Sequence, residues 1–139
     1  MKETPISAYE TTKGMIYFPR MLDKIRKHAR GELREDFVDN LGKGFDERCA
    51  GFLRVPYDAL VAKTLDGGSD EAVLDWCFAT GRELNELDIA IWNDYLSKRG
   101  QNDPAAEIVA RRKAESGLAD RDEIQTMIEY FEYDEGRKS

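Results

Sequence analysis

The chain has 139 residues, and its 41% hydrophobic and 35% charged content is typical of a folded globular protein rather than a disordered one. Its formal net charge of −7 argues against a dedicated nucleic-acid-binding protein, because neutralising phosphates requires a positive surface. Two cysteines outside any CxxC motif, an N-terminus without an apolar core, and the lack of an 18-residue apolar run predict a reduced, cytoplasmic protein that does not associate with membranes.

The first predicted helix covers residues 17–31. Pro19 suits a first helical turn, and Gly31 suits a helix end. Helical spacing places one set of apolar side chains on the same side: Met21, Leu22, Ile25 and Ala29. Residues 31–45 are predicted to form a loop.

Two short helices should follow. Residues 46–53 would begin with Asp46 as the N-cap, and residues 56–66 would end at the glycine pair after them. Helical spacing turns one set of side chains of the second helix inward: Leu60, Val61 and Leu65.

A pair of longer helices is predicted next, each with its own N-cap. Ser69 would cap residues 70–80, and Asn85 would cap residues 86–99. Each helix carries one tryptophan, Trp76 or Trp92, and we expect both to be buried in a helical hairpin.

Two final helices are predicted over residues 103–117 and 120–135. Asp120 and Glu123 have the spacing of a capping box at the start of the last helix. Its apolar stripe would consist of Ile124, Met127, Ile128 and Phe131.

These patterns predict an all-α fold, a single irregular helical bundle of six to seven short helices. No segment alternates apolar and polar residues for long enough to indicate a sheet. We expect one domain over residues 1–139, with residues 1–102 as the main bundle and residues 103–139 as an appended C-terminal helical hairpin.

The triplet Gly42-Lys43-Gly44 raises the question of an anion-binding loop, although it lacks the spacing of a phosphate loop. Glycines can turn backbone N–H groups outward, and a helix begins just beyond. The alternative is a tight turn with Lys43 in solvent. If the loop binds an anion, the candidate ligand-binding residues are Lys43, Asp46, Arg48, Cys49 and Tyr57.

Other chemistry has weak support. Cys49 follows Arg48 near a helix start, which would lower a thiol pKa, but a small buried residue explains it better. His28 could be a general base, yet a half-buried packing role is more common. The single histidine and two distant cysteines do not suit a metal site, and we expect no cofactor.

Charge is unevenly distributed. Residues 1–34 carry a net charge of +4, and residues 120–135 hold seven acidic residues against one basic. Either the basic and the acidic segments both face solvent, or they attract each other within a monomer or across a dimer. The basic set comprises Arg20, Lys24, Arg26, Lys27 and Arg30.

Four strings together resemble a small bacterial family known only as a domain of unknown function, DUF5069. They are GMIYFPRMLDKIRKHARG, NLGKGFDERCAGFLRVPYDALV, LDWCFATGRELNELDIAIWNDYLSKRG and DEGR. The resemblance spans nearly the whole chain and implies a stand-alone bacterial protein. It implies no activity, cofactor or catalytic residue.

No base, nucleophile and oxyanion donors assemble from recognisable motifs, so catalytic residues are unknown and an enzyme is not favoured. The leading hypothesis is a small non-enzymatic binding or interaction module that meets an unknown protein partner, or a second copy, through its basic helix or its tryptophan-bearing hairpin. The alternative is a small enzyme or anionic-metabolite-binding protein with its site around residues 42–48. Nucleic acid is the least favoured partner.

Overall fold

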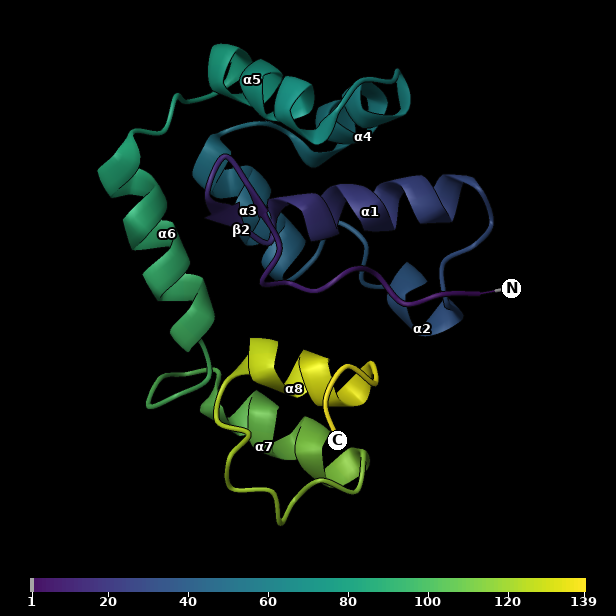
Figure 1. The fold of residues 1–139 in the computed structure, drawn as a ribbon, viewed down its shortest axis with the longest axis vertical. Coiled ribbons are helices and arrows are strands. Elements are labelled where there is room, and N and C mark those ends of the chain that lie inside the picture. The colour runs from purple at the N-terminus through teal and green to yellow at the C-terminus, as the bar shows by residue number, and fades with distance from the viewer. Residues whose placement is uncertain (1) are drawn as a thin grey trace. The chain divides into compact units, whose positions relative to one another are not determined.

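A computed structural model describes residues 2–139, which fold into eight helices and one two-stranded antiparallel sheet (Figure 1). The prediction of a predominantly helical fold is confirmed, with slightly more helices than expected. The elements are β1 (Thr11–Thr12), β2 (Met15–Ile16), α1 (Phe18–Ala29), α2 (Glu35–Val38), α3 (Phe45–Leu53), α4 (Tyr57–Leu65), α5 (Asp70–Thr80), α6 (Glu86–Lys98), α7 (Ala106–Glu115) and α8 (Met127–Asp134).

The chain divides into two compact units, the first up to Ile89 and the second from Ala90, and α6 runs through the boundary. In the first unit α4 contacts α1, α3 and α5, and β1 contacts α1 and α5. In the second unit α7 packs against α8 (Figure 1). The core of the first unit includes Phe18, Met21, Leu22, Leu53, Leu60 and Leu74, all fully buried.

The start of α3 differs from the prediction. The helix begins at Phe45 with Gly44 as its N-cap, so no side chain at the cap position bonds the first turn. Gly44 has φ 60° and ψ −122°, a backbone conformation that a residue with a Cβ rarely adopts. The carboxylate of Asp46 does not cap the following turn. It reaches back to the Gly42 amide, which donates a 3.1 Å hydrogen bond to Asp46 Oδ2.

The predicted inward face of α4 is only partly correct. Leu60 is fully buried, but Leu65 is 50% exposed. Thr64 is buried in its place, because its hydroxyl donates a 2.7 Å hydrogen bond to the Leu60 carbonyl and so needs no water.

Both predicted caps in the middle of the chain are confirmed. The Ser69 hydroxyl accepts a 3.1 Å hydrogen bond from the Ala72 amide at the start of α5. Asn85 and Asp88 form a reciprocal pair before α6: each side chain accepts a hydrogen bond from the other residue's amide, at 2.8 and 3.0 Å. Such reciprocal bonds satisfy two backbone donors that the first turn leaves open.

The predicted capping box at Asp120 and Glu123 is wrong. Residues 118–126 form turns, and α8 begins only at Met127, after a hydrogen bond from the Glu129 amide to the Thr126 hydroxyl. The Glu123 carboxylate pairs with Arg121 instead of capping a helix. Side-chain contacts in this segment therefore replace the helical pattern that the local sequence favours.

Candidate functional site

The predicted ligand-binding residues divide between the surface and the core of the first unit. Lys43 and Arg48 are exposed, whereas Asp46 and Cys49 are fully buried and Tyr57 is half-buried. The two cations and the buried carboxylate and thiol therefore do not share one surface.

Tyr57 instead supports the glycine loop. A Cβ placed on Gly42 would lie 2.8 Å from the Tyr57 ring, so only glycine fits against that ring. The φ of 77° at Gly42 also favours glycine. Gly44 also has a positive φ, and Lys43 is exposed, as expected for the tight turn. The loop works as a backbone turn packed on an aromatic ring.

Asp46 belongs to a buried ionic network that the sequence did not reveal. The Lys24 amine lies 2.8 Å from Asp46 Oδ1, with side-chain exposures of 8% and 0%. Tyr17 joins both groups: its hydroxyl donates to Asp46 Oδ1 at 2.7 Å and accepts from Lys24 Nζ at 2.9 Å. The Gly42 amide donates to Asp46 Oδ2, so both oxygens of the carboxylate accept hydrogen bonds.

This environment keeps the nearby hydroxyls and thiol protonated. Burial raises the pKa of the Tyr17 hydroxyl well above its ordinary value, and the negative charge of Asp46 raises it further. Burial, followed by the same charge, also raises the pKa of the Cys49 thiol and of the Tyr57 hydroxyl. The pKa of Cys49 thus moves opposite to the lowering that Arg48 would cause. A protonated thiol is a poor nucleophile.

The basic residues of α1 do not form the solvated face that the sequence suggested. Arg20, Lys24 and Lys27 are only 2%, 6% and 9% exposed. Their aliphatic stems pack inside the first unit, and their charged ends find partners there. His28, expected to be half-buried, is exposed.

Each of these buried cations has a specific acceptor. Besides Lys24 with Asp46, the contacts are Arg20 Nη1 to the Ile6 carbonyl at 3.1 Å, Lys27 Nζ to the Thr4 carbonyl at 3.0 Å, and Lys27 Nζ to Asp23 Oδ2 at 2.9 Å. Arg26, partly buried, pairs with Asp70 on α5. The basic residues therefore hold the first unit together.

An exposed apolar stripe runs along α6. Leu87, Ile91 and Tyr95 are 68%, 51% and 37% exposed, and they follow one another at four-residue spacing on the same side of the helix. Sequence reasoning passed over this stripe, although its signal was present: α6 has apolar residues on more than one side.

The two tryptophans differ in burial. Trp92 is 2% exposed, as predicted, and its ring centroid lies 6.1 Å from that of Tyr95. Trp76 on α5 is only half-buried, contrary to the expectation. Of the two tryptophans, only Trp92 is therefore fully part of the core.

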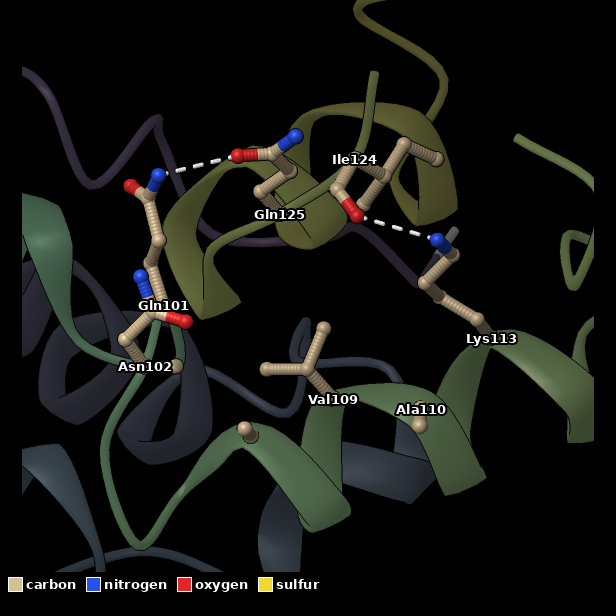
Figure 2. A pocket seen from close by; sticks show the side chains of 9 residues that line it. Gln101, Asn102, Val109, Ala110, Lys113, Ile124 and Gln125 are labelled. Carbon is tan, nitrogen blue, oxygen red and sulfur yellow. Dashed lines mark hydrogen bonds between the residues drawn. The ribbon is translucent and has the colours of Figure 1, made fainter. Parts of the chain in front are cut away.

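The second unit contains an open pocket of about 480 Å³ (Figure 2). Figure 2 shows Val109 of α7 pointing into the space between the Gln101–Gln125 pair on one side and the Lys113–Ile124 contact on the other. The lining residues are Gly100, Gln101, Asn102, Ala106, Val109, Ala110, Lys113, Ile124 and Gln125. Sequence reasoning missed this pocket because it expected a helix over part of its wall.

Local contacts shape both walls of the pocket. A Cβ on Gly100, which has φ 106°, would lie 2.6 Å from Val109 Cγ2, so glycine allows this close approach. Asp103 accepts hydrogen bonds from the Gly100 and Ala105 amides, each at 2.8 Å, and this fixes the turn before α7. The Lys113 amine donates to the Arg121 and Ile124 carbonyls of the turn segment across the pocket.

Two properties of the described chain bear on other classes of site. Within residues 2–139, no group of three or more His, Cys, Asp or Glu side chains could hold a metal ion. None of the helices over the same residues combines the length and the apolar character needed to cross a bilayer.

Comparison with known proteins places the chain by sequence. No curated protein matches it. A family described as a domain of unknown function, DUF5069, matches residues 2–137, which is nearly all of the chain. The protein therefore belongs to the DUF5069 family.

Proposed function

We propose that this protein is a non-enzymatic interaction module that associates with a second copy of itself through α6. The observation that carries the proposal is the exposed stripe of Leu87, Ile91 and Tyr95 on a helix that also buries Trp92 and Leu96. A helix with apolar residues on both sides is normally enclosed by other protein surface. The stripe on α6 supports a partner there.

A second copy suits this surface because α6 is self-complementary in the antiparallel direction. The helix begins with Glu86 and Asp88 and ends with Lys98. If two copies pair antiparallel about Ile91, Lys98 of each helix, which also pairs with Asp94 of its own helix, lies near Glu86 of the other. Leu87 then faces Tyr95 of the second copy. The opposed helix dipoles favour the same direction.

The surroundings of the candidate nucleophile support a non-enzymatic role. Cys49 is fully buried and its thiol pKa is raised, and the carboxylate of Asp46 already bonds Lys24 and Tyr17. A general base must reach a substrate proton directly or through one water. The alternative of an anionic metabolite at residues 42–48 has less support, since the exposed cations Lys43 and Arg48 share that segment with the exposed acidic Glu47.

Sedimentation velocity over a concentration series tests the proposal. A helix of 13 residues is about 20 Å long, so the interface is small and its Kd should be weak, on the order of 10 to 100 μM. Ile91→Glu should abolish the concentration-dependent dimer, because two charges would meet at its centre. Leu65→Glu, an exposed apolar position on α4, is the matched control and should leave the dimer intact.

Cysteine cross-linking tests the direction of pairing. In an antiparallel pair Ile91 faces its own copy, so Ile91→Cys should give a disulfide-linked dimer under mild oxidation. Leu87→Cys should not, because two such residues lie about two helical turns apart across the pair. The native Cys49 and Cys77 are buried and do not compete. A chain that stays monomeric at every concentration, or cross-links equally at both positions, would contradict the proposal.

A further inference from the structure

The pocket of the second unit is independent of the α6 stripe, and its chemistry points to a small-molecule ligand. We propose that it binds a small carboxylate with an apolar body and a hydrogen-bonding group at its far end. The carboxylate meets Lys113, the apolar body lies over Val109, and the far group meets the amide pair of Gln101 and Gln125.

Lys113 supplies the anchor for the carboxylate. Its ammonium has three N–H donors, and two of them are used, one by the Arg121 carbonyl at 2.7 Å and one by the Ile124 carbonyl at 3.0 Å. These bonds hold the amine at the pocket wall and leave the third donor for a ligand. Neither acceptor is charged, so the positive charge of the amine is not neutralised by them.

No other described residue neutralises this charge through an ion pair. The nine lining residues include no Asp or Glu. Glu123 feels the charge of Lys113, but its carboxylate pairs with Arg121. A partly buried ammonium without an anionic partner attracts one, and a charge-assisted hydrogen bond to a carboxylate is stronger than one between neutral groups.

The rest of the pocket sets the size and shape of the ligand. About 480 Å³ lies within the usual range for small-molecule sites. Val109 and Ile124 are buried apolar residues, and Ala106 and Ala110 leave room beside them. This surface suits methylene or similar apolar groups.

The far end of the pocket offers amide groups. Gln101 Nε2 donates to Gln125 Oε1 at 3.0 Å, and this pair lies across the pocket from Lys113 (Figure 2). Gln125 Oε1 has a second lone pair, which can accept a hydrogen bond from a ligand amide or hydroxyl.

A carboxylate fits better than a phosphate. Lys113 is a single point charge, and the lining contains no arginine. A phosphate carries up to two negative charges and is usually held by several N–H donors or a planar guanidinium. One ammonium matches one carboxylate.

The test uses adipamate, which has a carboxylate, four methylene groups and a terminal amide, and its neutral analogue adipamide. Heteronuclear NMR of the full chain follows the backbone amides during titration with each compound. Adipamate should shift the amides of the lining residues with a Kd on the order of 1 mM, as expected for a ligand of about ten heavy atoms. Adipamide should bind at least tenfold more weakly, because it lacks the charge. Inorganic phosphate should also bind more weakly.

Variants separate the pocket from the general charge of α7. Lys113→Met should weaken adipamate binding at least tenfold. Ala110→Leu should also weaken adipamate binding, because the larger side chain fills the pocket. This variant keeps the Lys113 contacts, so it tests the pocket even if Lys113→Met does not fold. Arg111→Met removes an exposed charge of α7 outside the pocket lining and should leave the Kd unchanged. Equal affinity for adipamate and adipamide, tighter binding of phosphate, or binding unaffected by Ala110→Leu would overturn the proposal.

Discussion

Removing the charge of Asp46 should destabilise the first unit more than removing any surface carboxylate. Asp46→Asn keeps the size of the side chain but only one acceptor oxygen, so either the bond from Tyr17 to Oδ1 or the bond from Gly42 to Oδ2 is lost. It also removes the negative charge beside the buried Lys24 ammonium. Breaking one member of a buried ion pair typically costs about 3–5 kcal/mol. The lost charge and the lost hydrogen bond place the expected loss within this range, at about 3–5 kcal/mol.

A double variant isolates the charge interaction. Lys24→Met alone leaves the carboxylate buried, although Tyr17 and Gly42 still donate to it. Combined with Asp46→Asn, it removes both charges, and well-packed neutral replacements are often tolerated. The double variant should therefore lose at least about 1.5 kcal/mol less than the sum of the two single variants.

Urea denaturation followed by circular dichroism measures these free energies of unfolding. The exposed pair of Lys13 and Asp75 provides the control, and Asp75→Asn should cost less than about 1 kcal/mol because solvent screens it. A loss below about 1 kcal/mol for Asp46→Asn, or strict additivity in the double variant, would refute the buried-network interpretation.

Three further predictions follow from burial, backbone conformation and charge. Trp92→Ala should cost about 3–5 kcal/mol in urea unfolding because Trp92 is 2% exposed, and the half-buried Trp76→Ala should cost less; the reverse order would contradict the assigned burial. In thermal melts, Gly44→Ala should lower the free energy of unfolding by about 1–3 kcal/mol, because alanine is strained at a φ of 60°. Lys43→Ala should change the free energy of unfolding by less than about 0.5 kcal/mol. Burial alone would raise the pKa of the Asp103 carboxyl, but backbone hydrogen bonds and a nearby arginine lower it below the ordinary 3.8. The carboxylate therefore stabilises the fold above about pH 4, and this contribution is lost as the pH falls through the lowered pKa, so melts at decreasing pH should show a smaller acid loss for Asp103→Asn than for the wild type.

Local chemistry decided the features that the sequence alone could predict. Ser69 and Asn85 mark the starts of α5 and α6 because each side chain bonds an amide only three residues away. Pro19 lies in the first turn of α1 for an equally local reason, its fixed φ. Such signals act within one turn, so neighbouring residues contain all the information needed.

The candidate site depended on tertiary contacts. By sequence Lys24 is typical of a surface residue, and its ammonium is buried because it contacts Asp46 from another helix and the Tyr17 hydroxyl. Residues 118–126 carry a plausible capping pair, yet the Lys113 amine bonds the Arg121 and Ile124 carbonyls of that segment. Those contacts hold it as turns and open the pocket beside α7. Burial and competition between distant hydrogen-bond partners are set by residues far apart in the chain, which is why the local pattern could not predict them.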